Sequence, residues 1–450
     1  MGTRSALHRA RSAVWAEVRG ASPLTILVIG FSLFVMYAFP GYMSSDPVNQ
    51  LHEARTGVFS SAHPPIMAEQ WRLLEVFVTG PILMLLLQGA LFLGGLYRIL
   101  RRAMSPRAAA VCACAVLLWP PVLTTMGVIW KDAQMAAYLL AGIAALLDAR
   151  LAVRLLGLVL LTAACAFRHN AAAAVLPVVG LLFVWRPGQR WWLRYPIAVA
   201  AFAVVMFVAF RVNAMLTTQS TFLSPFYTDI VGVLYYEDHR SDEDLREVLR
   251  GTPLLHDTDI HARARALYAP KTSYQVTRGD DRLFEDPTTP EHIAALTRAW
   301  KLLVFNDPLA YLTHRNAVFA ELLGLSDEPL WGPVYTRFAE SHDQELWIDH
   351  QAMNSRIQLV LSHTFYRLAT ETSLFRPYLY AVIALLLLAL CCRDRLSLTI
   401  LASGLGYELG YWPITSTPDH RYSQWMITCA CIAVVLLFAQ RYRAGRGAVA

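Results

Sequence analysis

The sequence predicts an all-α polytopic membrane protein with about ten transmembrane helices, and two observations support this prediction. The first is composition: the 450 residues are 56% hydrophobic and 16% charged, with a mean hydropathy of +0.40. Soluble domains average about 45–50% apolar and about 25% charged residues, so this chain is shifted toward lipid. The second is patterning, because the apolar residues gather in stretches of about 17–22 residues, enough for a helix to cross a bilayer. Together they exclude a disordered chain, a fibrous repeat and an ordinary cytosolic enzyme.

Ten apolar stretches are expected to cross the membrane. They lie near 24–40, 76–97, 108–128, 132–148, 151–167, 171–185, 195–211, 377–391, 396–413 and 422–440. The first ends in Phe39-Pro40-Gly41-Tyr42 with no small-residue cleavage site. We therefore expect it to be a retained helix and not a signal peptide.

Basic residues predict the orientation of these helices. Eighteen of them fall in the tails and short loops on one side of this layout, and five fall in the short loops on the other. Because Lys and Arg collect in cytoplasmic loops, both termini are expected in the cytoplasm, which agrees with an even number of spans. Only three of the 39 basic residues are lysines, a usage that suggests a GC-rich bacterial genome. We therefore expect a multi-pass protein of a bacterial inner membrane.

The layout divides the chain into three parts. Residues 1–211 form an N-terminal module of seven transmembrane helices, whose first outer loop is 41–75, and residues 377–450 form a C-terminal module of three. The segment between them, 212–376, follows the seventh span and is therefore expected on the exoplasmic (periplasmic) side. Its core, 212–374, holds 14 basic and 23 acidic residues, a net charge of −9.

Helix-start signals predict that the exoplasmic segment is α-rich. Ser241 and Asp244 have the spacing of a capping box, and Gly251 follows as a stop. Thr289-Pro290 and Asp307-Pro308 each place proline at a first helical position, and the second helix is expected to end at Gly324.

Polar residues that are unusual for a membrane protein converge on the outer ends of the predicted spans. Ionisable groups at membrane depth are costly and usually face a cavity or one another. The candidate site residues on this face are Asp46, Glu53 and His63 in the first outer loop, Lys131, Asp132, Arg168, His169 and Asn170 in two tight connections, and Glu408, Asp419, His420, Arg421 and Tyr422 around the last one.

Each of these residues also has a simpler interpretation. Asp46 is placed to cap an interfacial helix. Lys131 and Arg168 are placed to snorkel to the membrane surface as interface anchors. His63-Pro64-Pro65 is also consistent with a rigid turn before an interfacial helix.

The combination favours chemistry at a phosphate. A carboxylate such as Asp46 can deprotonate an incoming nucleophile, and the cations Lys131, Arg168 and Arg421 can stabilise charge on a departing phosphate oxygen. No nucleotide-binding βαβ unit is visible, and we expect no nucleic-acid partner. Since activated nucleotides are scarce outside the cytoplasm, a lipid-linked phosphate that arrives from the bilayer is the expected leaving group.

Four segments carry a resemblance to a known family. They are Tyr42-Met43-Ser44-Ser45-Asp46 with Gly57 and His63-Pro64-Pro65 after it, Trp130-Lys131-Asp132, Phe167-Arg168-His169-Asn170, and Pro418-Asp419-His420-Arg421-Tyr422. In this order and on this face, they resemble the GT-C glycosyltransferases, polytopic enzymes that transfer a sugar from a polyprenyl-phosphate carrier. Asn306-Asp307-Pro308-x-x-Tyr311-Leu312-x-x-Arg315 also resembles a recurring feature of bacterial members.

The resemblance implies a GT-C-like helix bundle with an α-rich exoplasmic domain and a role for each site residue. Asp46 would be the catalytic base of a single inverting displacement, and Lys131, Arg168 and Arg421 would bind the donor phosphate. The remaining candidates would line the cavity, with His63 and Asp419 shaping it and Glu408 contacting sugar hydroxyls. The acceptor would be an envelope glycan, a lipid or a protein. Some relatives hold a divalent metal in the first loop, but Asp46 is followed by Pro47 and not by a second acid, so metal dependence stays open and no other cofactor is expected.

Three alternatives remain open from the sequence. A transporter or flippase of a lipid-linked sugar predicts an internal repeat and charges near the midplane, and neither is visible. A glycan polymerase or ligase that uses a diphosphate-linked oligosaccharide would share the same face and cations. A non-catalytic assembly or sensor protein would bind a glycan through the exoplasmic domain and tolerate the loss of Asp46.

Overall fold

The computed structural model describes residues 20–61, 63–219, 226–327, 329–336, 354–391 and 394–447. This part of the chain is all-helical, with 20 α-helices, three short 3₁₀ turns and no β-strand. The N-terminal arginines that contribute to the predicted orientation (Arg4, Arg9, Arg11 and Arg19) and residues 337–353 of the predicted exoplasmic domain lie outside the described residues.

The helices form a bundle, a set that lies across one end of it, and a separate outer group. The bundle consists of α2 (Pro23–Ala38), α5 (Ile82–Leu100), α6 (Pro106–Leu117), α7 (Pro120–Met126), α8 (Lys131–Leu146), α9 (Leu151–Phe167), α10 (Ala172–Leu182), α11 (Trp191–Leu216), α19 (Pro377–Cys391), α20 (Arg395–Gly410) and α21 (Gln424–Gly447). At its end lie α3 (Ser45–Thr56), α4 (Ile66–Glu75), α18 (Arg356–Glu371), η1 (His169–Ala171), η3 (Ser373–Phe375) and η4 (His420–Ser423). The outer group is α12 (Phe226–Tyr236), α13 (Asp242–Val248), α14 (Ile260–Leu267), α15 (Tyr274–Thr277), α16 (Pro290–Asn306) and α17 (Pro308–Leu323).

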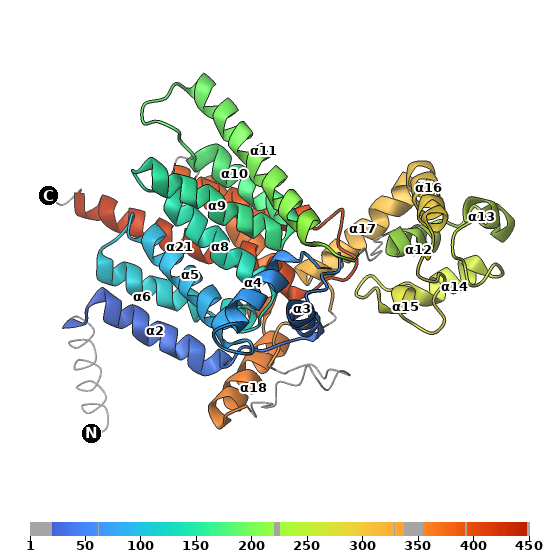
Figure 1. The fold of residues 1–450 in the computed structure, drawn as a ribbon, viewed down its shortest axis with the longest axis horizontal. Helices are drawn as coiled ribbons and strands as arrows, with labels where there is room; N and C mark the ends of the chain where they lie inside the picture. Colours follow the sequence, from blue (N-terminus) through green and yellow to red (C-terminus); the bar gives the residue numbers. More distant parts are fainter. Residues whose placement is uncertain are drawn as a thin grey trace.

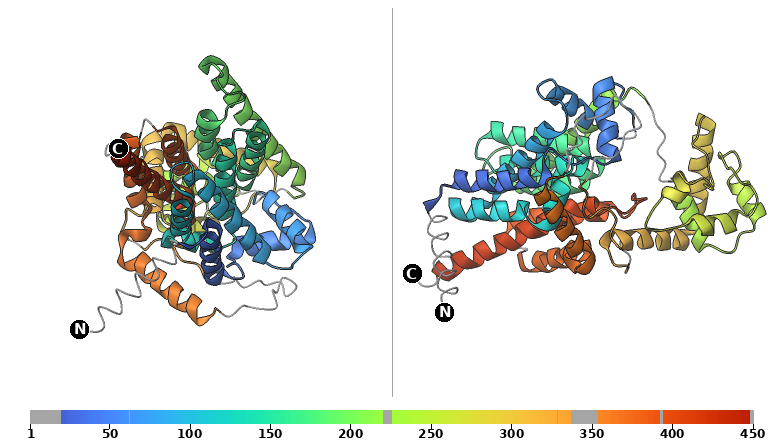
Figure 2. Two further views of the ribbon diagram at one scale, coloured as in Figure 1. Left: turned by 90° about the vertical axis from the view of Figure 1, so that its left-hand side faces the viewer. Right: turned by 90° about the horizontal axis from the view of Figure 1, so that it is seen from below.

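Figure 1 shows how these groups are arranged: α17 leads from the end of the bundle to the outer helices α12 to α16. Figure 2 shows the same separation from below. The outer group has a hydrophobic core of its own, which includes Ile230, Leu234 and Leu296, whereas the bundle core includes Phe92 and Trp425. Two separate cores make the outer group a domain in its own right.

Three described helices are long and apolar enough to cross a membrane: Ile82–Leu100, Trp191–Leu216 and the segment His420–Arg443. A bent pair, Pro106–Leu117 with Pro120–Met126, gives a fourth if it counts as one span. Helices of 16 residues, such as Pro23–Ala38, are about 24 Å long and fall short of a hydrocarbon core of about 30 Å. Every predicted stretch coincides with at least one helix, but length and composition identify three or four of the described helices as candidate spans and do not confirm ten.

The stretch predicted near 108–128 is not one continuous helix. It bends by 71° between α6 and α7. Pro120 and Pro121 follow Trp119, which is extended (φ −63°, ψ 125°). Proline removes a backbone donor and forces the preceding residue out of the helical region, so the helix stops and restarts here. The hydropathy pattern does not register this break because proline leaves the stretch apolar.

Close approaches between helices hold the bundle together. A Cβ atom added at Gly95 of α5 would lie 2.6 Å from the backbone carbon of Leu140 in α8, so only glycine fits there. The outward surface of α11 carries exposed apolar side chains such as Val199 and Phe207. An exposed apolar surface of this kind is what a helix presents to lipid.

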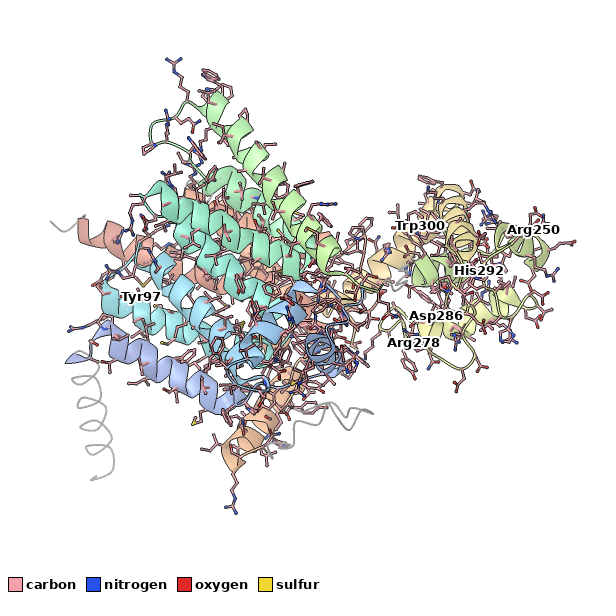
Figure 3. The ribbon with its side chains drawn as sticks, in the orientation of Figure 1. Tyr97, Arg250, Arg278, Asp286, His292 and Trp300 are labelled. Atoms are coloured by element: carbon pink, nitrogen blue, oxygen red, sulfur yellow. The ribbon has the colours of Figure 1, made fainter. Side chains whose placement is uncertain are left out.

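The helix starts predicted in the outer domain are confirmed. Ser241 and Asp244 form a reciprocal capping box at the start of α13. Thr289 caps α16, and α17 begins with Pro308 after Asp307. Gly324 ends α17 in the left-handed region with φ 69°, which favours glycine. In Figure 3, the charged residues labelled on this domain, Arg250, Arg278 and Asp286, lie at the opposite end of the molecule from Tyr97.

Candidate functional site

Helix α3 brings Asp46 to the end of the bundle. The Tyr42 amide donates to the Gly127 carbonyl at 3.1 Å, and this bridge holds the start of the first loop beside the segment that leads into α8. Asp46 lies in the first turn of α3, but its carboxylate accepts from Arg421 Nη2 at 2.8 Å. Its side chain is 27% exposed. Asp46 is therefore directed at the polar cluster, and the helix-cap interpretation does not account for it.

Lys131 is the first residue of α8 and joins the same cluster. Its Nζ lies 2.9 Å from Nδ1 of His63, and Nε2 of His63 lies 3.8 Å from Asp46 Oδ1. In the described part of the chain, no carboxylate lies within the 4.0 Å ion-pair distance of Lys131. Lys131 is therefore directed at the cluster, and the interface-anchor interpretation does not account for it. Burial and the nearby charge of Arg168 lower the pKa of Lys131 to about 7, so an anion bound beside it would favour its charged form.

Arg168 follows α9 and forms a two-pronged ion pair with Asp132 in α8. Its Nε and Nη2 donate to the two carboxylate oxygens at 2.8 and 2.7 Å. Asp132 is fully buried, and the Tyr407 hydroxyl also donates to it at 3.4 Å. A buried carboxylate requires such partners, so Asp132 fixes the direction in which Arg168 points.

Arg421 lies at the centre of the cluster. Its Nε is 3.0 Å from Asp419 Oδ2 and 4.0 Å from Asp132 Oδ2, while its Nη2 holds Asp46. The Tyr422 ring contacts two guanidinium groups, with Arg168 at 4.8 Å and Arg421 at 5.4 Å from its centroid. Cation–π contacts of this kind allow two positive groups to share one site.

A cavity of about 260 Å³ opens beside this cluster. Its lining residues are Pro64, Lys131, Arg168, His169, Asn170, Tyr411, Ile414, Thr415, Ser416 and Tyr422. Lys131 and Arg168 thus face the cavity directly. Arg421 lies behind the cavity wall, in contact with Tyr422. Asp46 lies farther back and reaches the lining residue Lys131 through His63. His63 and Asp419, which were predicted to shape the cavity, are not among its lining residues. The cavity is slightly smaller than the range of about 300–1,000 Å³ typical of sites for drug-sized ligands.

The surroundings of Asp46, His63 and Asp419 shift the pKa values of these three groups in different directions. Burial by itself raises the pKa of Asp46, but the nearby charges of Arg421 and Lys131 outweigh it and hold the pKa below its ordinary value. Burial and the Lys131 charge lower the pKa of His63 to about 4, so the imidazole is neutral at pH 7. Burial raises the pKa of Asp419 to about 6, against the opposing effect of Arg421.

Several predicted residues lie away from the cavity or contact it only through others. Glu53 accepts from the Ser60 amide and hydroxyl and fixes the turn after α3. Glu408 accepts from the Ser423 hydroxyl at 2.7 Å beneath η4. His420 donates through Nε2 to the Phe375 carbonyl at 2.9 Å.

His169 and Asn170 do line the cavity. His169 Nε2 lies 2.9 Å from Asn213 Nδ2, and its ring stacks on Phe210 with a centroid distance of 4.6 Å. Asn170 Nδ2 is buried without a hydrogen-bond partner among the described residues. These two side chains are therefore available to position a ligand.

Sequence reasoning missed two aromatic residues of the site. Tyr411 lines the cavity and stacks on Tyr422 with a centroid distance of 4.7 Å and an angle of 8°. The Tyr407 and Tyr411 hydroxyls lie 2.9 Å apart. Their four-residue spacing places both on one helix face, a signal that was available in the sequence.

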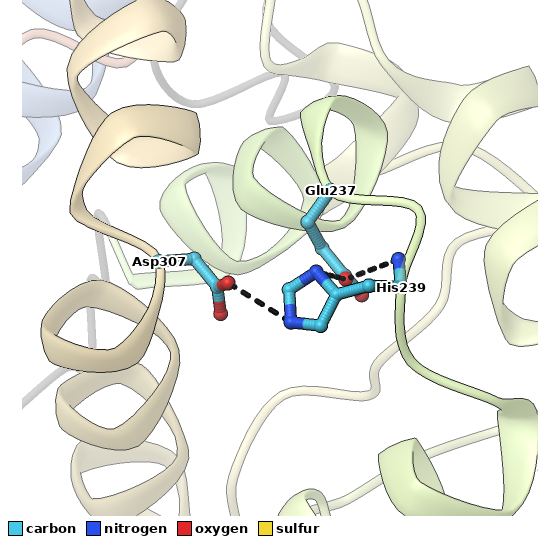
Figure 4. A group of neighbouring side chains, drawn as sticks. All are labelled: Glu237, His239 and Asp307. Atoms are coloured by element: carbon cyan, nitrogen blue, oxygen red, sulfur yellow. Dashed lines mark hydrogen bonds and ion pairs between the residues drawn. The ribbon is translucent and has the colours of Figure 1, made fainter.

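Among the described residues of the first loop, no three ligating side chains lie close enough to share a metal ion. Glu53 accepts from Ser60, and Glu69, another acid of this loop, pairs with Arg72 at 2.6 Å. Over the described ranges, the one group of three ligating side chains with closely spaced donor atoms is Glu237, His239 and Asp307, which lies in the outer domain (Figure 4).

Comparisons with known proteins found no similar protein: no protein-family model, no curated protein and no solved structure matches the chain.

Proposed function

We propose that the protein is a GT-C-type membrane glycosyltransferase. It would move one sugar from a polyprenyl-phosphate donor to an acceptor hydroxyl and invert the anomeric configuration. The observation that carries this proposal is the meeting of Asp46, Lys131, Arg168 and Arg421 beside one cavity at the end of a helix bundle. These residues come from four separate connections along the chain, and chemistry at a phosphate gives a reason for bringing them together.

The proposed reaction is a single in-line displacement at the sugar's anomeric carbon. The acceptor oxygen forms a bond to this carbon, and its proton passes to the Asp46 carboxylate. The bond from the anomeric carbon to the phosphate oxygen breaks, and polyprenyl phosphate departs with the electron pair. Lys131 and Arg168 face the cavity and stabilise the charge that develops on the departing oxygen.

Donor binding would also activate the base. While Arg421 holds Asp46 at 2.8 Å, the pKa of Asp46 lies below its ordinary value and the carboxylate is a weak base. A donor phosphate competes with Asp46 for the Arg421 guanidinium, because phosphate and carboxylate are alternative partners for the same fork of donors. Asp46 therefore becomes more basic when the donor is bound.

We further propose the topology of ten spans with both termini in the cytoplasm. The site would then open on the periplasmic side of a bacterial inner membrane. The match between helices and predicted stretches supports this layout, and so does the distribution of basic residues. The helices of 16 or 17 residues would cross where the bilayer thins around the bundle.

The test is a deletion strain complemented with wild type, Asp46→Asn or the control Glu69→Gln at matched expression. Glu69 is a carboxylate of the same loop that pairs with Arg72 and not with the cluster. Mass spectrometry of surface glycans, lipid-linked sugars and glycoproteins should show the loss of one sugar mass, restored by wild type and Glu69→Gln only. Loss of a whole oligosaccharide would identify a polymerase or ligase instead. Equal restoration by Asp46→Asn would remove Asp46 from the chemistry and favour transport or assembly.

A further inference from the structure

Two carboxylates and an imidazole meet where the outer domain joins the helix that leads back to the bundle. Glu237 directly follows α12, and Asp307 lies between α16 and α17 (Figure 4). His239 Nδ1 lies 3.1 Å from Glu237 Oε2, and its Nε2 lies 3.2 Å from Asp307 Oδ1. The side chains of Glu237 and Asp307 are 1% and 9% exposed, whereas that of His239 is 59% exposed. The cluster is therefore anchored on two buried acids and reachable from solvent.

The electrostatics of this position favour an added cation. Glu237 lies just beyond the C-terminal end of the 11-residue helix α12, where the helix dipole disfavours a carboxylate. The backbone amides of His239 and Arg240 donate to its Oε2 at 3.2 and 3.3 Å and partly offset this effect. Arg240 pairs with Asp307 and lies 3.8 Å from Glu237, so one guanidinium serves two carboxylates. One negative charge is left over. Glu237 Oε1 has no hydrogen-bond partner among the described residues, and His261 Nε2 lies 3.3 Å from it.

One edge of the His239 ring is placed to share an ion with a carboxylate. The two short distances involve different ring nitrogens, Nδ1 with Glu237 Oε2 at 3.1 Å and Nε2 with Asp307 Oδ1 at 3.2 Å. One ion can take only one of these nitrogens, and the other can donate its N–H to the second carboxylate. Zinc–ligand bonds of about 2.0–2.2 Å in a tetrahedral shell separate neighbouring ligands by about 3.3 Å, which either distance fits. One donor atom from each of the three residues lies within 4.8 Å of the others, so the third ligand would move toward the ion when it binds.

We propose that Glu237, His239 and Asp307 bind a divalent transition-metal ion of the zinc type. An imidazole ligand favours Zn²⁺ over Ca²⁺ and Mg²⁺, which prefer oxygen. The ion ties the end of α12 to the start of α17. Arg315 of α17 donates through Nη1 to the carbonyl of Thr415, which lines the cavity, at 2.7 Å. The ion therefore fixes α12 to α17, the helix of the outer domain that contacts the cavity wall.

The test uses the full chain, purified in detergent without a polyhistidine tag and stripped with a chelator. Zn²⁺ is titrated against a chromophoric competitor, and bound metal is counted by elemental analysis. Wild type and the control His256→Ala, which changes a histidine of the same domain outside the cluster, are expected to bind one Zn²⁺. His239→Ala, at an exposed and therefore tolerant position, should bind it at least about tenfold more weakly. Equal binding by wild type and His239→Ala, or no binding by either, would overturn the proposal.

Arg240→Gln sharpens this test. Because Arg240 competes with the ion for Asp307, its removal should tighten Zn²⁺ binding. Unchanged or weaker binding would show that no ion enters next to Asp307 and that the cluster is an internal ion network only. Ca²⁺ binding as tight as Zn²⁺ binding would overturn the role of the imidazole.

Discussion

Two aspartates, one at the end of the bundle and one in the outer domain, each pair with an arginine, but their surroundings differ. Asp229 in α12 accepts from Trp300 Nε1 at 2.7 Å, His314 Nε2 at 3.2 Å and Arg315 Nη2 at 2.5 Å. Its side chain is 2% exposed. Asp46 has one close arginine, is 27% exposed, and lies behind the wall of the cavity, next to His63, which contacts the lining residue Lys131.

The difference separates a structural charge from a reactive one. Asp229 has its donors supplied by the protein, so it has no remaining capacity for a substrate. Asp46 shares its arginine with Asp419, and the neighbouring Lys131 has no carboxylate within ion-pair distance among the described residues, so burial and Arg168 lower its pKa to about 7. A buried ion pair alone is thus a poor sign of function. An incompletely paired group beside a cavity is a better one.

The largest expected effect on stability comes from Asp229→Asn. This change leaves the Arg315 guanidinium buried without a carboxylate, which costs about 3–5 kcal/mol. Asp46→Asn should cost less than about 1 kcal/mol, because Asp46 is partly exposed and Arg421 keeps Asp419. Thermal unfolding of both variants in detergent checks the comparison. If they lost similar stability, the distinction between the two aspartates would be wrong.

Lys131→Met should lower kcat/KM by about 10²–10³-fold and weaken inhibition by added polyprenyl phosphate. The change removes one of the two basic side chains that line the cavity, but it leaves the ion pairs of Arg168 and Arg421 in place. The matched control is Arg72→Gln, which removes a cation of the first loop that pairs with Glu69. A similar loss in both variants would indicate a general charge effect and not phosphate binding.

A pair of adjacent glycines tests whether close helix packing stabilises the bundle. In the outer domain, by contrast, the stabilising contact tested above is a buried ion pair. A Cβ at Gly95 would meet the Leu140 backbone at 2.6 Å, and one at Gly94 would meet nothing within 4 Å. Gly95→Ala should therefore destabilise the protein by about 1–3 kcal/mol. Gly94→Ala should be neutral or slightly stabilising, because alanine favours the helix. If Gly95→Ala and Gly94→Ala unfolded at the same midpoint, this result would contradict close packing of α5 on α8.

The smallest expected effect is on the pH dependence of turnover. The pKa of Asp419 is raised to about 6, so the carboxylate takes up a proton as the pH falls through this value. Protonated Asp419 no longer opposes the Arg421 charge, and Arg421 then holds Asp46 more firmly. Turnover should fall by about tenfold at pH 5 relative to pH 7. Asp419→Asn should be slower at neutral pH and should lack this acid limb in its pH–rate profile. If Asp419→Asn kept the same acid limb, the titration behind that limb would belong to another group.

Much of the fold was predictable because its signals are local. The helix starts at Ser241, Thr289 and Pro308 follow from side chains that cap or restrict their own turn, and the structure confirms them. The break before Pro120 was also encoded locally, but hydropathy does not report it. Hydropathy alone did not fix the number of spans, because several helices are shorter than the apolar stretches that contain them.

The site was only partly predictable. Lys131, Arg168 and Arg421 do gather near Asp46, as expected from their shared position at the outer ends of the stretches. The pairing of Arg168 with Asp132 could not be derived, because the two lie 36 residues apart and nothing local links them. Glu408 and His420 were placed on the correct face, but their side chains satisfy nearby polar groups instead of facing the cavity.

The sequence by itself determined the helical content, the helix boundaries in the outer domain and the polar residues concentrated at one end of the apolar stretches. These properties depend on hydrophobic burial and on interactions within one or two helical turns. Only the tertiary structure decided which carboxylate holds which arginine, that Lys131 faces a cavity, and that Glu237, His239 and Asp307 meet. Those outcomes depend on distances between helices that are remote in the chain, and such distances are set when packing brings the helices together.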